Sequence, residues 1–169
     1  MNFHAFIEWL KYTWRAKDLH GVHSPFAYDF NEKVLRNHAK TAKVPATESI
    51  NWLEPKYNKL LNDIFIHYGY TTVHYVQQDD ESEPAAFDML VMKNDVPGHW
   101  VRLFNKYAPT LKSNCAIVID GIHRTKRHTA KWERLHKHPK VMLSIDLFGV
   151  GLLFFRPEFK EKQHFVLKY

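Results

Sequence analysis

The sequence predicts a single α/β domain, in which helices flank a mostly parallel sheet and a helical segment precedes it. From residue 72 onward, almost continuous apolar runs alternate with helical patterns, which is typical of parallel strands covered on both faces. The last runs are closely spaced, which favours an antiparallel C-terminal edge. We expect one domain over residues 1–169, with a helical extension over residues 1–56 and an α/β core over residues 57–169.

Three helices are expected before the sheet. The first has apolar residues at spacings of three and four, which form a stripe that needs a surface to pack against: Phe3, Phe6, Ile7, Leu10 and Trp14. The second begins after Ser24 and Pro25, a cap residue and a proline suited to the first turn. The third covers residues 57–68 and ends at Gly69, where a left-handed conformation is favoured. Residues 40–55 lack a steady period and are expected to form a surface connection.

The core begins where β-branched and aromatic residues become frequent, which predicts a strand over residues 72–76. Further strands are expected over residues 87–92, 115–119, 141–147, 150–155 and 164–167. Helices are expected over residues 99–107 and 125–138.

The composition excludes several classes of protein. With 45% hydrophobic residues the chain is too apolar to be disordered, and no run approaches the ~20 apolar residues that span a bilayer. A single cysteine, Cys115, cannot form an internal disulfide, and Glu8 and Lys11 interrupt the segment where a secretory signal would lie. We therefore expect a cytoplasmic protein with no membrane partner. The net charge of +6 permits a nucleic-acid partner, but no recognised motif supports one.

Candidate catalytic residues follow the strands, because open α/β sheets bind ligands beyond the carboxyl ends of their strands. Asp120 directly follows an apolar run, and Gly121 lets the chain turn beside it. We predict Asp120 and His123 as catalytic residues, with His123 as a base or ligand at the same strand end. The alternatives are that Asp120 caps the next turn or helix, and that His123 lies there by chance.

Two parts of the chain resemble a group of bacterial class I S-adenosylmethionine-dependent, O-methyltransferase-like proteins. The first part is residues 15–26 (RAKDLHGVHSPF). The second part consists of short segments near the C-terminus: Trp132 and Glu133, residues 138–141 (HPKV), 144–148 (SIDLF) and 151–156 (GLLFFR). The resemblance covers about residues 12–38 and 86–169 and implies a Rossmann-like sheet.

The chain departs from this family where the cofactor would bind. Class I methyltransferases hold S-adenosylmethionine on an acidic, glycine-rich loop after the first strand, and no G-x-G pattern follows residues 72–76. The run over residues 87–92 resembles the family's fourth strand, so about a third of the expected sheet domain is missing. Some relatives bind a metal through an aspartate at the position of Lys93, where a cation would repel it. The resemblance therefore implies a truncated sheet that lacks the family's cofactor loop and metal ligands. The alternatives are that Asp79, Asp80 or Glu81 accepts the ribose hydroxyls, and that Asp95 and Asp120 bind a metal weakly.

The N-terminal motif supplies the predicted ligand-binding residues, since a motif of this family can line a substrate pocket: Arg15, Lys17, His20 and His23. The alternative is a rigid corner between two helices. Gly21 and Pro25 favour such a turn, in which both histidines would hydrogen-bond to the backbone.

The leading functional hypothesis is a degenerate, non-catalytic relative of the methyltransferases that binds or regulates a protein partner or a second copy. One alternative is an active methyltransferase on a small acceptor, with S-adenosylmethionine as cofactor and Asp120 or His123 as base. Another is a basic nucleic-acid-binding module. In that case, cations on the helix over residues 125–138 would bind phosphates and Trp132 would stack on a base, although such a face is ordinarily only solvated.

Overall fold

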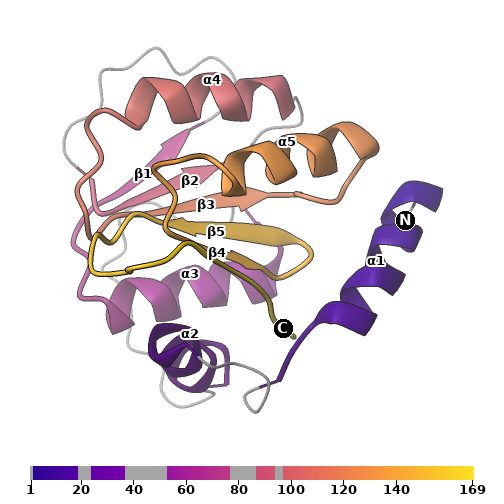
Figure 1. Ribbon diagram of the computed structural model, residues 1–169, viewed down its shortest axis with the longest axis horizontal. Coiled ribbons are helices and arrows are strands. Elements are labelled where there is room, and N and C mark those ends of the chain that lie inside the picture. The colour runs from indigo at the N-terminus through magenta and orange to yellow at the C-terminus, as the bar shows by residue number, and fades with distance from the viewer. Residues whose placement is uncertain (1, 19–23, 37–52, 77–86, 94–96) are drawn as a thin grey trace.

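The computed structural model describes residues 2–18, 24–36, 53–76, 87–93 and 97–169 (Figure 1). The helices are α1 (Phe3–Arg15), α2 (Pro25–Phe30), the π-helix η2 (Asn31–Leu35), α3 (Pro55–His67), α4 (Pro97–Tyr107) and α5 (Lys126–His136). The strands are β1 (Val73–Val76), β2 (Met89–Met92), β3 (Ala116–Asp120), β4 (Leu143–Asp146), β5 (Val150–Phe154) and β6 (Gln163–Val166). The predicted elements are present, and their ends differ from the prediction by one or two residues at most positions.

The strands form one six-stranded mixed sheet in the order β1-β2-β3-β5-β4-β6, which confirms the predicted α/β fold. Only β5 runs antiparallel to its neighbours, β3 and β4. It lies inside the sheet, and the edge strand β6 pairs parallel to β4. The reversal occurs in a short turn between β4 and β5, in which Phe148 adopts a left-handed conformation with φ 66°. Strand β5 is antiparallel because this short turn joins it to β4 in a hairpin.

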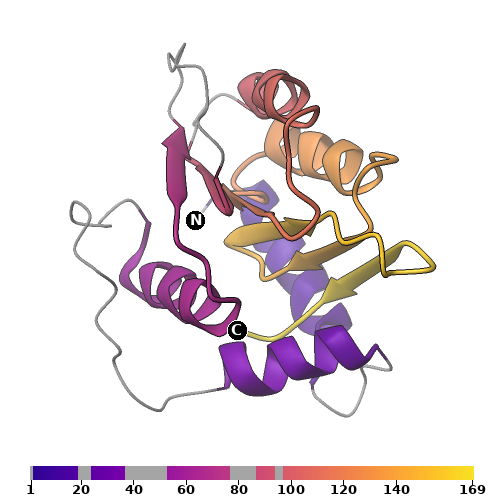
Figure 2. The ribbon, with the colours of Figure 1, turned by 90° about the vertical axis from the view of Figure 1, so that its left-hand side faces the viewer.

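Helices cover both faces of the sheet (Figure 2). Along β3, Ala116 and Val118 pack in the cluster beneath α2, η2 and α3, whereas Ile117 and Ile119 pack in the cluster beneath α4 and α5. This two-sided burial explains why the strands are continuous apolar runs rather than alternating ones. Among the described residues, the helices are all too short or too polar to cross a bilayer.

Helix α1 lies beside the carboxyl ends of β3 and β4 rather than on either face of the sheet (Figure 1). Ala5 is its only buried residue. The Tyr12 hydroxyl donates to the Leu167 carbonyl at 2.6 Å, and the Asn2 amide donates to the Arg124 carbonyl at 2.8 Å. The described part of the domain does not supply the surface that the apolar stripe needs, because these contacts orient most of the stripe outward and leave exposed Phe3, Phe6, Leu10 and Trp14.

A buried carboxylate fixes the beginning of β1 beside β2. Asp88 Oδ2 accepts hydrogen bonds from the backbone N–H and the hydroxyl of both Thr71 and Thr72, at 2.8–3.1 Å. Burial by itself raises the pKa of Asp88, but these four donors outweigh it and lower the pKa from 3.8 to about 2. The ionised form of Asp88 therefore stabilises the fold.

This pKa predicts a loss of stability in acid. The contribution of Asp88 is complete above about pH 4 and disappears as the pH falls towards 2, because the folded state then takes up the proton less readily than the unfolded state. Denaturant titrations between pH 7 and pH 2 should show this decline. Asp88→Asn should lower the free energy of unfolding at neutral pH by about 1–3 kcal/mol and reduce the dependence of this free energy on pH. An equal dependence on pH in the wild-type chain and in Asp88→Asn would contradict the assignment.

Candidate functional site

A cavity of about 160 Å³ lies where β3 ends, next to the turn between β4 and β5. It is lined by residues from α1, the start of α3, the loop after β3 and that turn: Ala5, Glu54, Tyr57, Asp120, Gly121, His123, Arg124, Phe148 and Gly149. The fold thus brings the two predicted catalytic residues, Asp120 and His123, to one cavity at the carboxyl edge of the sheet.

Asp120 is the last residue of β3, and its side chain is 15% exposed. Its carboxylate accepts a hydrogen bond from Arg124 Nη2 at 3.2 Å. Gly121 has φ +70°, a left-handed conformation that favours glycine at this turn. The N-cap of α5 is Thr125 and not Asp120. Asp120 therefore presents a charge-paired carboxylate to the cavity.

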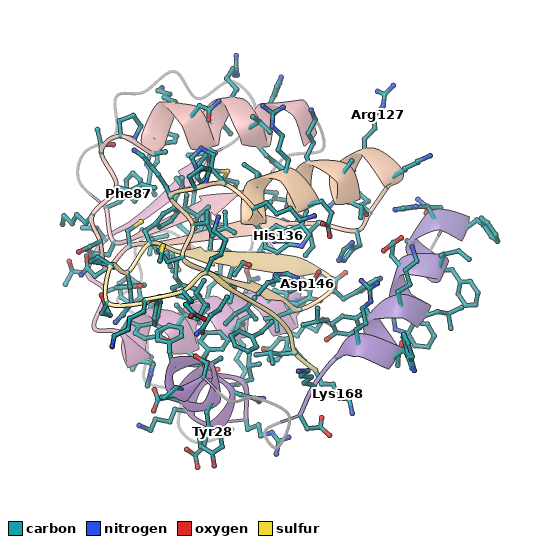
Figure 3. All side chains as sticks on the ribbon, viewed as in Figure 1. Tyr28, Phe87, Arg127, His136, Asp146 and Lys168 are labelled. Carbon is teal, nitrogen blue, oxygen red and sulfur yellow. The ribbon has the colours of Figure 1, made fainter. Side chains whose placement is uncertain are left out.

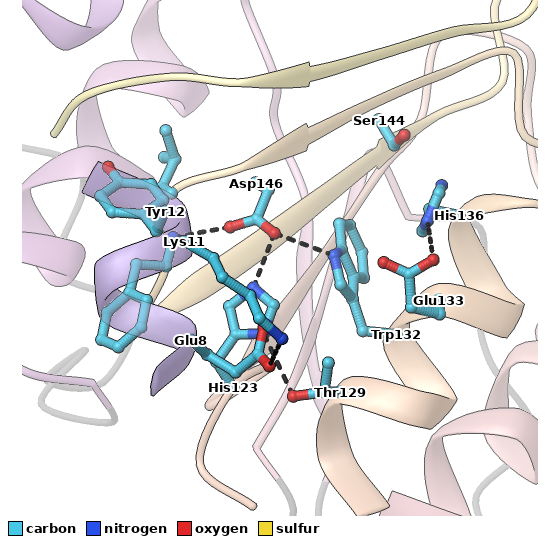
Figure 4. A network of polar contacts seen from close by, with 12 residues as sticks. Glu8, Lys11, Tyr12, His123, Thr129, Trp132, Glu133, His136, Ser144 and Asp146 are labelled. Atoms are coloured by element: carbon cyan, nitrogen blue, oxygen red, sulfur yellow. Dashed lines mark hydrogen bonds and ion pairs between the residues drawn. The ribbon is translucent and has the colours of Figure 1, made fainter. Parts of the chain in front are cut away.

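His123 is buried, and both of its ring nitrogens have partners (Figure 4). Its Nε2 lies 2.7 Å from Asp146 Oδ2, and its Nδ1 lies 3.2 Å from Thr129 Oγ1. The Thr129 hydroxyl in turn lies 3.0 Å from Nε2 of His4 in α1. His123 would have to break one of its hydrogen bonds to take a proton from a ligand. In this arrangement it connects α1, α5 and β4.

Asp146, at the end of β4, is the centre of this network and was not predicted as a site residue. Besides His123, its carboxylate accepts the indole N–H of Trp132 at 3.2 Å and the backbone N–H of Phe148 at 2.8 Å. Asp146 is only 5% exposed and lies in the interior of the domain (Figure 3). The sequence does contain a signal for it, because Asp146 ends a buried strand in the same way as Asp120.

Trp132 has a structural role that conflicts with the predicted one. Its side chain is fully buried, and a Cβ on Gly151 in β5 would lie 2.6 Å from its ring. The hypothesis that Trp132 stacks on a nucleic-acid base is therefore wrong. The basic neighbours of Trp132 in the sequence suggested that it lies on the exposed face of the helix. Its side chain instead faces the sheet.

Tyr57 closes the cavity from α3. Its hydroxyl is so close to Gly149 that a Cβ there would lie 2.1 Å from the oxygen. Burial raises the pKa of Tyr57 to about 12, and the nearby charge of Glu54 acts in the same direction. At neutral pH, Tyr57 thus offers the cavity a protonated hydroxyl rather than a base.

A second polar cluster lies on the α5 side of β4 and β6. Ser144 Oγ lies 2.8 Å from His164 Nδ1, and the ring of His136 stacks on His164 with centroids 4.2 Å apart. Glu133 contacts His136 at 3.1 Å (Figure 4). Ser144 is fully buried, so its hydroxyl is not open to a substrate as a serine nucleophile must be.

Two further predicted site residues, Arg15 and Lys17, do not line the cavity. Arg15 is exposed in the last turn of α1. Lys17 is also exposed, and its backbone N–H donates to the Val166 carbonyl at 2.8 Å. His20 and His23 lie outside the described residues. The proposed ligand-binding group is thus not assembled around Asp120 by the residues that are described.

The cavity restricts what this site can bind. Its volume is about half of the roughly 300 Å³ at which ligand pockets begin, so the described lining encloses room for water or a small polar group. The described residues contain no group of three or more histidine, cysteine, aspartate or glutamate side chains placed to hold a metal ion.

Comparison of the chain with protein-family models, curated proteins and solved structures found no match.

The network predicts that Asp146 is critical for stability. Asp146→Asn should lower the free energy of unfolding by about 3 kcal/mol, because three buried donors lose a charged acceptor. The matched control is Asp18→Asn, since Asp18 pairs with Lys168 at the surface at 3.1 Å with its side chain 47% exposed. This control should cost less than about 1 kcal/mol. Urea denaturation measures both changes, and equal losses would contradict the role assigned to Asp146.

Proposed function

We propose that this chain is a methyltransferase-like protein of the class I S-adenosylmethionine-dependent type that does not transfer methyl groups and acts as a binding or regulatory partner. The observation that carries the proposal is the short connection between β1 and β2, which pair in parallel. In the family that the sequence resembles, the glycine-rich loop and the ribose-binding carboxylate belong to the region after the first strand. Here residues 77–88 alone join the two strands, and they contain no glycine.

The energetic consequence is large. Hydrogen bonds to charged groups contribute about 1.5–3 kcal/mol each, so the loss of three of them removes roughly 4–9 kcal/mol. Micromolar binding corresponds to about 8 kcal/mol. A chain without these contacts would retain little specific affinity for the cofactor.

The C-terminal half of the sheet supports the relationship to the family. The segments of the resemblance over residues 144–148 and 151–156 fall on β4, the following turn and β5. They include Asp146 and Gly151, which the fold uses for the hydrogen bond from Trp132 and for close contact with its ring. The matching residues therefore have structural tasks that do not require the chain to be an enzyme.

The enzymatic alternative has one observation in its favour, the pair of His123 and Asp146 at 2.7 Å. A carboxylate that orients a histidine is common in acid–base catalysis. In this chain, however, the other ring nitrogen of His123 contacts Thr129, and the adjoining cavity is small. These contacts favour a structural role for the pair.

Calorimetric titration with S-adenosylmethionine tests the proposal. We expect no saturable heat up to about millimolar cofactor, because the contacts that would give micromolar affinity are missing. Saturable micromolar binding would overturn the proposal. Asp120→Asn is the matched variant: if binding appears in the wild-type chain and is lost in this variant, the cavity at β3 holds the cofactor and the enzymatic alternative is correct.

A further inference from the structure

Helix α1 exposes most of the large apolar surface on the described part of the chain. Seven large hydrophobic side chains are exposed there, and five of them lie on α1: Phe3 (81%), Phe6 (42%), Trp9 (41%), Leu10 (46%) and Trp14 (88%). We call these five side chains the α1 face. Single exposed apolar residues are ordinary, but a cluster of this kind on one short helix marks an interaction surface.

The α1 face is continuous and uncharged. With about 100° between successive residues, its five side chains and Thr13 occupy an arc of about 140°. The charged residues of the helix, Glu8, Lys11 and Arg15, lie outside this arc, and Glu8 and Lys11 form an ion pair with each other at 2.7 Å. A partner can therefore cover the whole face without burying a charge.

The contacts of α1 with the domain hold the face outward. Beyond the border of the face that Trp9 forms, Ala5 is buried and Tyr12 donates to the Leu167 carbonyl. Tyr12 also packs against Phe148, with ring centroids 5.5 Å apart. His4 contacts Thr129 in α5. Turning the apolar side inward would break all of these contacts, so the described part of the domain does not cover the α1 face.

The size of the α1 face fits a protein interface. With about 200 Å² for a complete aromatic side chain, its four aromatic residues leave roughly 500 Å² exposed, before Leu10 is included. A stable interface buries about 800 Å² on each partner. The α1 face thus supplies more than half of the area that a stable dimer needs.

The pattern of side chains is self-complementary. Phe3 and Trp14, the most exposed pair, have their midpoint between residues 8 and 9, and Phe6 and Leu10 have theirs at residue 8. A two-fold axis near this point would align two antiparallel copies of α1. Phe3 of each copy would then meet Trp14 of the other, and Phe6 would meet Leu10.

We propose that the α1 face is a two-fold interface, through which two copies of this chain pair by antiparallel packing of their α1 helices. A lipid surface or an acidic peptide is less suitable, because cations would then be expected along both borders of the apolar arc. Lys11 and Arg15 lie towards one border only, and the other border adjoins the buried Ala5. This inference is independent of whether the chain transfers methyl groups.

Sedimentation equilibrium of the full chain, over about a hundredfold range of concentration, tests the proposal. The mass should rise from 20.1 kDa towards twice that value. Leu10→Glu places a charge in the centre of the face and should raise the dissociation constant at least about tenfold. The matched control is Ile66→Glu on α3, where Ile66 is 44% exposed and Leu10 46%, and it should leave the constant unchanged.

Disulfide trapping tests the antiparallel geometry. Cys115 is buried, so single substitutions on α1 provide the accessible thiols. When Phe3→Cys and Trp14→Cys variants are mixed and oxidised, dimers that link one variant to the other should exceed dimers of either variant with itself. A preference for self-linked dimers would overturn the antiparallel arrangement.

Three further results would overturn the proposed interface. One is a wild-type chain that remains monomeric at every concentration, and another is a dimer that Leu10→Glu does not weaken. The third concerns lipid binding. If the wild-type chain is monomeric and sediments with phosphatidylserine vesicles, and Leu10→Glu abolishes this binding, the occupant of the α1 face is a lipid surface.

Discussion

The carboxylate of Asp146 is the interaction on which the carboxyl edge of the sheet depends. It ends β4 and accepts hydrogen bonds from the loop after β3, from α5 and from the turn before β5, through His123, Trp132 and Phe148. A buried carboxylate is costly unless such donors surround it, and each donor is itself buried and needs an acceptor. The three segments are therefore fixed together. His123 also contacts Thr129, which in turn contacts His4, so the network reaches α1.

This network determines the shape of the candidate site. Because His123 is held against Asp146, and Tyr57 lies over Gly149, the cavity beside Asp120 is small and its polar groups are largely paired within the protein. Catalytic sites usually present to the substrate at least one polar group that can exchange a proton with it. The carboxylates and the histidine of the described edge form contacts within the protein.

The same contacts explain the exposed surface of α1. The helix is attached through Ala5, Tyr12 and its N-cap Asn2, all on one side, so its aromatic side chains remain in solvent. An amphipathic helix normally buries its apolar side within its own domain. In this chain the apolar side of α1 faces outward instead. The largest exposed apolar surface of the described residues therefore lies next to the edge of the sheet at which open α/β folds usually bind ligands.

The sequence alone determined the local elements of this fold, because the signals for them lie within a few residues. Pro25 and Gly69 mark a helix start and a helix end, and the apolar runs locate the strands. It also placed Asp120 and His123 at one strand end. Only the tertiary structure decided that Asp146 organises this edge, that Trp132 is buried and that the apolar side of α1 faces outward. These features depend on contacts such as that between His4 and Thr129, which join distant parts of the chain and leave no local pattern in the sequence.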